Sequence, residues 1–150
     1  MTRLAQLLSN KVLFATLAGW VVAQTIKVLL AVRRKHQFDF RWFLGTGGMP
    51  SAHSSGVAAL ATGVGLELGF HSAGFAVALV LAVVTMFDAQ GVRRSAGKQA
   101  ILLNKMLDEV YLKGQVSEER LIELLGHTPI EVFVGGLIGC LLAIGICRFF

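Results

Sequence analysis

Charged residues are scarce in this chain of 150 residues, making up 15% of the composition against 55% for hydrophobic residues. Soluble domains usually carry about 25% charged residues. Together with a mean hydropathy of +0.68, this deficit excludes an ordinary soluble domain and indicates that lipid surrounds most of the chain. The length predicts a single domain over residues 1–150.

Cysteine is rare as well. Cys140 and Cys147 lie seven residues apart within one apolar run, so they share a helix face and cannot bridge each other. Their expected role is packing. The sequence has no cluster of cysteine ligands and no other metal-ligand spacing, and it has no internal repeat. We therefore expect no metal site and no organic cofactor.

The net charge of +5 comes from basic residues that lie between apolar runs instead of gathering on one soluble face. This distribution favours attraction to anionic lipid headgroups and argues against nucleic acid as a partner. The expected partners are therefore the bilayer and a membrane lipid.

Four apolar segments suit transmembrane helices, which need roughly 20 residues. They are residues 12–32, 51–68, 73–87 and 129–147. Between the last two, apolar residues recur at helical spacing from Ala100 to Val110 with charged residues among them, which predicts an amphipathic helix at the membrane interface. The expected fold is all-α: an integral membrane bundle of about four spans with one interfacial helix.

Basic residues are concentrated in two of the connections, those after the first and third spans, while the turn at 67–74 has no Lys or Arg. The positive-inside rule then predicts that both basic connections face the cytoplasm across the cell (inner or plasma) membrane. The ends of the first and third spans and the starts of the second and fourth would share that face. Every candidate catalytic residue lies at one of these four ends.

One chemical motif is Gly-Gly-Met-Pro-Ser-Ala-His-Ser at residues 47–54. Glycines allow close backbone approach, Pro50 suits the first turn of a helix, and Ser51 with the amides of a helix start forms an anion site. His53 can protonate a leaving oxygen held there. The alternative is an ordinary capped helix start with an interfacial histidine.

The second motif is Gly-His-Thr-Pro-Ile-Glu at residues 126–131. Thr128 and Glu131 match a capping box, with Pro129 at the first helical position. Glu131 also follows His127 by four residues, so it can orient the imidazole and leave one ring nitrogen as a nucleophile. The structural and the chemical interpretation are compatible.

Cations complete the pattern. Lys27 lies toward the end of an apolar span, where an ionisable group suggests function, although a lysine there can also snorkel to the surface. Arg34 follows it two helical turns later. After the third span come Asp88, Arg93, Arg94 and Lys98. Arginine suits phosphate oxygens, so Arg93 or Arg94 is a candidate phosphate clamp, while Asp88 and Lys98 suit structural or orienting roles.

These residues resemble a known signature. Lys27-x6-Arg34, then Pro50-Ser51-Ala52-His53, then His127-x3-Glu131 is similar to the three-part motif of the type 2 phosphatidic acid phosphatase and vanadium haloperoxidase superfamily. The chain as a whole closely resembles the small divergent bacterial and plastid branch of that superfamily. The segments that carry this resemblance are residues 47–53, 88–94 and 126–129.

The resemblance implies a role for each matching residue. His127 would be the nucleophile that becomes phosphorylated, Glu131 its orienting acid, and His53 the acid for the leaving group. Lys27 and Arg34 would hold the phosphoryl oxygens, beside the anion site expected at Ser51. The chain departs from the superfamily motif at four positions: Ala52 for Gly, Lys35 for Pro, Glu131 for Asp, and Leu121 for an Arg six residues before the nucleophile. Arg93 or Arg94 would have to replace that last arginine.

The predicted function is therefore metal-independent hydrolysis of a lipid phosphomonoester through a phosphohistidine. A cytoplasmic site favours phosphatidylglycerophosphate or phosphatidate, with a polyprenyl diphosphate as the alternative substrate if the site faces outward. The main alternative function is a non-catalytic lipid-binding or assembly protein that retains a phosphate pocket, which Leu121 favours. A haloperoxidase is a weaker alternative, because those enzymes are soluble.

Overall fold

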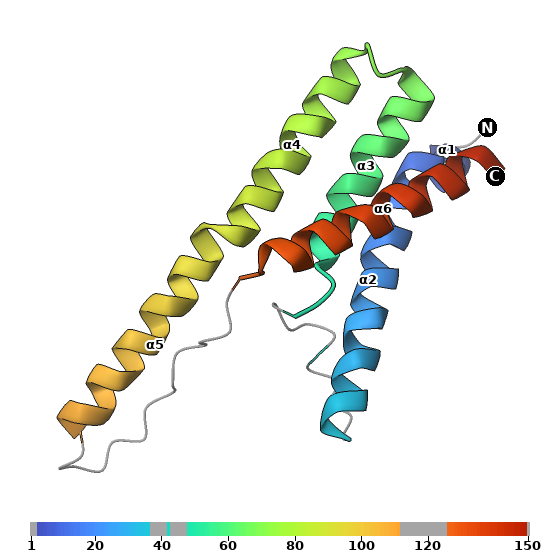
Figure 1. The fold of residues 1–150 in the computed structure, drawn as a ribbon. Helices are drawn as coiled ribbons and strands as arrows, with labels where there is room; N and C mark the ends of the chain where they lie inside the picture. Colours follow the sequence, from blue (N-terminus) through green and yellow to red (C-terminus); the bar gives the residue numbers. More distant parts are fainter. Residues whose placement is uncertain (1–2, 37–41, 43–47, 112–125, 150) are drawn as a thin grey trace.

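The structure is a computed structural model that describes residues 3–36, 42, 48–111 and 126–149. Within these residues the chain forms helices and no strand, as the sequence predicted. The helices are α1 (Arg3–Leu8), α2 (Lys11–Lys35), α3 (Ala52–Leu68), α4 (Ala73–Gln90), α5 (Val92–Tyr111) and α6 (Pro129–Phe149). Figure 1 shows their arrangement as a bundle from which α5 extends.

Three stretches of the described chain are long and apolar enough to cross a membrane: Lys11–Arg34, Ala73–Met106 and Pro129–Phe149. The fourth segment predicted to span is also helical, as α3, but it has 17 residues. That length is at the short end of the range of about 17–25 residues for a spanning helix. The protein is thus an all-α membrane bundle, with α3 shorter than its neighbours.

The short helix α3 is the centre of the bundle and packs against α2, α4 and α6 (Figure 1). Its buried positions are all small residues: Ala52, Ser54, Ser55, Gly56, Ala58, Ala59, Ala61, Gly63 and Gly65. Small side chains let helix backbones approach closely, which is the main source of helix association inside a membrane. The Ala, Gly and Ser content of this segment predicted such packing correctly.

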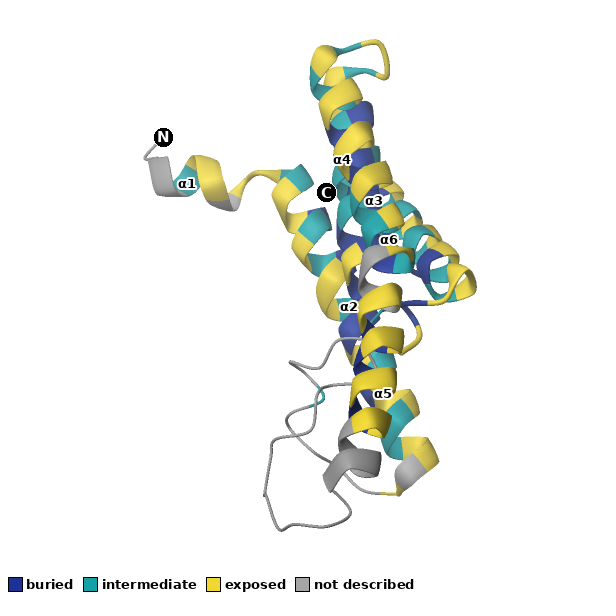
Figure 2. Ribbon diagram, turned by 90° about the vertical axis from the view of Figure 1, so that its left-hand side faces the viewer, coloured by how far each residue is buried: buried dark blue, intermediate teal, exposed yellow. Residues whose placement is uncertain are grey.

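The helix α4 lies at the side of the bundle and buries only Ala78, Ala82 and Ala89. Its large residues point outward: Val77 is 70% exposed and Phe87 is 73% exposed. Figure 2 shows exposed positions alternating with intermediate and buried ones along α4, and mainly exposed positions on the described part of α5. Large apolar side chains on an outer face suit contact with lipid tails. On the inner face, Ala78 and Ala82 pack against Ala61 of α3.

The amphipathic helix predicted near residues 100–110 is present as α5. Figure 1 shows it continuing roughly along the line of α4 beyond Gly91. The reason is that the Gly91 N–H still donates to the Phe87 carbonyl, at 2.8 Å, so helical hydrogen bonding persists at the junction. The polar segment therefore prolongs α4 on the side of the bundle where α3 and α6 begin.

Candidate active site

The candidate site lies where four parts of the chain meet. The Ser51 N–H at the start of α3 donates to the Glu131 carbonyl in the first turn of α6, at 3.1 Å. The His127 N–H, just before α6, donates to the Ala89 carbonyl in the last turn of α4, at 3.0 Å. Lys27 of α2 lies against Gly48. The structure thus brings together the helix ends that the span order predicted to share one side.

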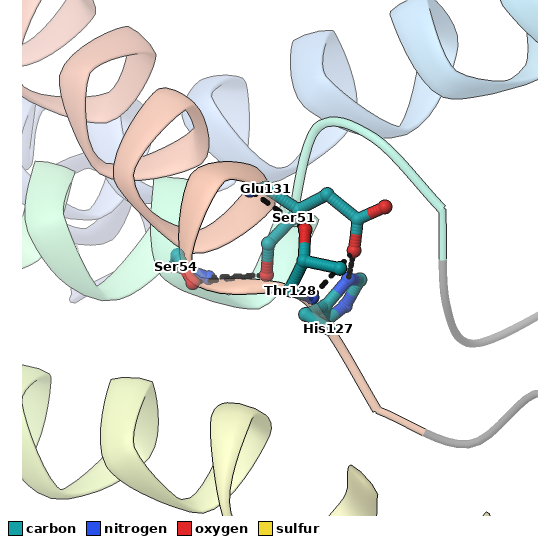
Figure 3. A network of polar contacts seen from close by, with 5 residues as sticks. All are labelled: Ser51, Ser54, His127, Thr128 and Glu131. Carbon is teal, nitrogen blue, oxygen red and sulfur yellow. Dashed lines mark hydrogen bonds and ion pairs between the residues drawn. The ribbon is translucent and has the colours of Figure 1, made fainter.

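The centre of the site is the pair His127 and Glu131 (Figure 3). The Nδ1 atom of His127 lies 3.3 Å from the Oε2 atom of Glu131, and the histidine side chain is only 5% exposed. A carboxylate can only accept a hydrogen bond, so this contact requires the proton on Nδ1. The lone pair is then on Nε2, which is the form a nucleophilic histidine needs.

Glu131 also has the capping role that the sequence suggested. Its Oε2 atom accepts from the Thr128 N–H at 2.9 Å, and its own N–H donates to the Thr128 hydroxyl at 3.4 Å. Pro129 is the first residue of α6, as predicted. One carboxylate oxygen therefore binds both the helix start and the His127 ring, so the cap fixes the carboxylate that orients the imidazole.

Lys27 and Gly48 form the wall of the site on the α2 side. Gly48 has φ +84°, a backbone conformation that favours glycine, and a Cβ added there would lie 3.4 Å from the Lys27 Cδ atom. The Lys27 stem thus packs directly on the Gly48 backbone. Both residues act on His127, Lys27 through its charge and Gly48 through a backbone hydrogen bond.

The surroundings of His127 lower its pKa. The largest cause is burial, which disfavours the charged ring, and the positive charge of Lys27 acts in the same direction. The hydrogen bond and charge of Glu131 and the Gly48 backbone oppose this effect without reversing it. The ring is therefore neutral near neutral pH, as an attacking nitrogen must be.

The start of α3 differs from the prediction at Pro50. The helix begins at Ala52, and Ser51 is its N-cap, so Pro50 precedes the helix instead of forming its first turn. The Ser51 hydroxyl accepts from the Ser54 N–H and from the Ser54 hydroxyl, the latter at 2.9 Å, and Ser51 is fully buried. The capping bond decides where the helix starts. Contact between Ser51 and a phosphate stays a prediction.

His53 lies in the first turn of α3 and is exposed, unlike its buried neighbours Ala52 and Ser54. It is two residues from Ser51, whose amide binds Glu131. The two candidate catalytic histidines therefore belong to the same end of the bundle, one buried and one exposed.

The other predicted phosphate ligands are less central. Arg34 is exposed in the last turns of α2, and Lys98 is exposed on α5. Asp88 is half-buried beside Ala89, the residue whose carbonyl binds His127. Arg93 and Arg94 belong to the first turn of α5, but their side chains lie outside the described residues, as does Leu121.

Two contacts in this part of the bundle were not predicted from the sequence. Gln24 is 4% exposed in α2, one turn before Lys27, and its Nε2 donates to the Trp42 carbonyl at 3.1 Å. The amide inside an apolar span was the available signal. Nothing in the sequence indicated the contact of the Ala89 carbonyl, because a contact of a backbone atom does not require a particular residue type. Among the described residues, no group of three His, Cys, Asp or Glu side chains could hold a metal ion.

Comparison with known proteins identifies the family of the chain. Residues 8–142 match the model of the Divergent PAP2 family. This chain belongs to that family. It is also 45% identical, over 97% of its length and 99% of the relative's, to a protein of Bacillus subtilis (strain 168) described as an uncharacterized membrane protein, YuiD. No solved structure matches. The predicted resemblance to a divergent branch of the superfamily is thus confirmed.

Proposed function

We propose that this protein is a membrane lipid phosphatase in which His127 becomes transiently phosphorylated. The observation that carries the proposal is the buried His127 ring, held through Nδ1 by Glu131 at 3.3 Å beside a lysine. Membership of the Divergent PAP2 family supports the choice of phosphoryl transfer. A neutral imidazole next to a cation suits attack on an anionic phosphoryl group.

The proposed reaction has two steps. The Nε2 atom of His127 attacks phosphorus, an N–P bond forms, the P–O bond to the lipid breaks, and His53 gives a proton to the departing oxygen. Water then attacks the phosphohistidine, transfers a proton to His53 and releases inorganic phosphate. Lys27 offsets negative charge on the phosphoryl oxygens, and Arg34, Arg93, Arg94 and Ser51 are the further proposed ligands.

The depth of the site favours a lipid as substrate. Lys27 and Arg34 are seven residues apart on α2, about 10 Å along the helix axis. Between them Leu29 is 62% exposed and Leu30 is 39% exposed, surfaces that suit lipid tails. Lys27 therefore lies further from the end of α2 than these exposed leucines. A phosphate carried by a membrane lipid can reach this depth from within the leaflet.

The direct test is phosphate release by purified protein in detergent. Wild type should hydrolyse phosphatidylglycerophosphate or phosphatidate in the presence of EDTA, vanadate should inhibit, and His127→Ala should be inactive. Equal rates for wild type and His127→Ala would refute the proposal. Strict dependence on magnesium would refute the metal-independent mechanism.

The preference for these two lipids rests on a cytoplasmic site, which the basic connections support. Single cysteines at Lys98 and His71, in a Cys140→Ala, Cys147→Ala background, test this orientation in intact cells. Both positions are exposed, and they flank opposite ends of α4. Only the His71 position should react with an impermeant thiol reagent. Reaction at the Lys98 position alone would favour a polyprenyl diphosphate on the outer face.

A non-catalytic phosphate-binding protein is the second candidate. The observation that favours it is Leu121, which stands where the wider superfamily has an arginine six residues before the nucleophile. Binding of a lipid phosphate that is lost in Lys27→Met, without any turnover by wild type, would support this candidate over the enzyme.

A further inference from the structure

A very close contact between α6 and α3 lies next to Glu131. A Cβ added to Gly135 of α6 would collide with the Ser51 carbonyl and would lie 3.1 Å from the Ser51 nitrogen. The same Ser51 nitrogen donates to the Glu131 carbonyl. Gly135 is also one helical turn after Glu131, so its own N–H points to that carbonyl. The Ser51 peptide, Gly135 and the Glu131 carbonyl are therefore parts of one contact.

The α3 side of this contact is held by buried hydrogen bonds. The Ser51 hydroxyl accepts two hydrogen bonds from Ser54, and both residues are fully buried. One turn later, the Ser55 hydroxyl donates to the Gly19 carbonyl of α2, at 2.8 Å. Because these hydrogen bonds hold the start of α3 together and join α3 to α2, we expect a side chain at position 135 to displace α6.

Displacement of α6 would separate Glu131 from His127, because the two residues are anchored differently. Glu131 belongs to α6, whereas the backbone of His127 is held by the Ala89 carbonyl of α4. The Nδ1–Oε2 distance of 3.3 Å is already longer than the usual 2.7–3.2 Å for such a bond. Any further separation would weaken it.

We propose that Gly135 is a positioning residue for the nucleophile: its missing side chain lets α6 meet the first turn of α3, and this contact holds the Glu131 carboxylate on the His127 ring. The geometric part of this inference stands without any enzymatic activity. Its effect on turnover rests on the proposed phosphatase function.

Three glycines of α6 provide a matched test. Gly135→Ala introduces the collision with Ser51, and Gly139→Ala introduces a similar collision with the Ser55 carbonyl, one turn further from the site. Gly145→Ala is the control, because nothing lies within 4 Å of a Cβ at that position. A general loss of packing would affect the first two variants alike, whereas a positioning role distinguishes them.

The primary readout is the ring tautomer of His127, measured by nitrogen NMR on histidine-labelled protein in detergent and assigned with His127→Gln. Wild type, Gly139→Ala and Gly145→Ala should keep the proton on Nδ1. Gly135→Ala should move a substantial share of it to Nε2, because the ring loses its acceptor. Unchanged His127 signals in folded Gly135→Ala, or an equal change in Gly139→Ala, would overturn the inference.

A milder variant covers the case in which Gly135→Ala does not fold. Ser54→Ala removes one donor to the Ser51 hydroxyl without adding volume, so the same tautomer change should appear at smaller amplitude. Its absence would contradict the inference.

If wild type proves to be a phosphatase, Gly135→Ala should also lower kcat by up to about 100-fold with little change in KM, as expected for a small misplacement of a reacting group. If wild type shows no phosphatase activity, the tautomer measurement still tests the role of Gly135. The proposed function can then fail while the positioning role holds, and the reverse is also possible.

Discussion

The two ends of the bundle begin their helices with similar caps but connect them differently. In the turn between α3 and α4, Ser72 accepts from the Phe75 N–H at 3.1 Å and donates to the Gly69 carbonyl at 2.7 Å. These contacts join residues within a single turn. At the opposite end, Ser51 caps α3 while its amide binds Glu131 of α6, and His127 binds α4 through Ala89.

The comparison shows why only one of the two ends forms a candidate site. The Gly69–Ser72 turn is closed by local bonds and by the edge-to-face rings of Phe70 and Phe75, whose centroids are 5.1 Å apart. The other end joins three helices through backbone bonds and brings Lys27 to the same place. Ionisable groups from different helices can then act on one ring, which a local turn does not achieve.

The largest effect on kcat is expected when the two roles of Glu131, helix capping and orientation of the His127 ring, are separated. Glu131→Gln keeps a residue that suits a capping box but removes the charge that holds the His127 proton on Nδ1. Loss of the orienting carboxylate should lower kcat by about 100-fold or more with little loss of stability. Thr128→Ala is the opposite variant: it removes a cap bond of 3.4 Å and leaves the carboxylate. It should cost about 1 kcal/mol of stability and little activity.

Kinetics and thermal unfolding of both variants in detergent measure the two effects. If Thr128→Ala lost as much activity as Glu131→Gln, the cap and the catalytic role would be inseparable, and the comparison between the ends would fail.

The next largest effect is expected on kcat/KM, in a comparison of two lysines at opposite ends of α2. Lys27→Met keeps the stem that packs on Gly48 and removes the charge near His127. A charge-assisted contact contributes about 1.5–3 kcal/mol, so kcat/KM should fall by about 10- to 160-fold. Lys11→Met, at the other end of the same helix, should leave kcat/KM unchanged. Equal losses in both variants would indicate a general electrostatic effect and would contradict a specific role for Lys27.

A smaller and more specific effect concerns pH. Burial lowers the pKa of His127, so the neutral nucleophile should persist below the ordinary histidine value of about 6.5. The acid limb of kcat/KM should therefore lie below pH 6.5. Because the pKa is lower in the folded than in the unfolded protein, stability should also decrease as the pH falls from about 6.5 through the folded-state pKa. An acid limb above pH 7 would show that burial does not govern this group.

The smallest effect is expected at the far end. Ser72→Ala removes the cap of α4 and should cost about 1 kcal/mol of stability without changing kcat. Thermal unfolding and turnover of the same preparation measure both quantities. A clear loss of turnover at unchanged stability would mean that the two ends are coupled through α4, contrary to the comparison.

Local patterns made several features of this protein predictable. The Thr128–Glu131 cap and the His127–Glu131 contact follow from spacings of three and four residues at the start of a helix, which bring such side chains within reach of each other. The meeting of helix ends follows from the alternating direction of successive spans. The small residues of α3 marked it as a packed helix.

The remaining features depend on tertiary geometry. The Ser51–Glu131 and His127–Ala89 hydrogen bonds join backbone atoms, so the side-chain pattern could not predict them. The contact between Lys27 and Gly48 depends on how the connection from α2 to α3 returns to the bundle. Pro50 was expected inside the helix because proline suits a first turn, but the buried Ser51 hydroxyl caps the helix one residue later.

The central claim is that His127 carries the phosphoryl group, and trapping that group tests it most directly. Purified protein mixed with phosphate-labelled phosphatidylglycerophosphate and quenched in alkali should carry an acid-labile label on His127, located by peptide mass spectrometry. His53→Ala should slow its formation, and His127→Ala should abolish it. Full turnover by His127→Ala, or steady turnover by wild type with the label on another residue, would contradict the account.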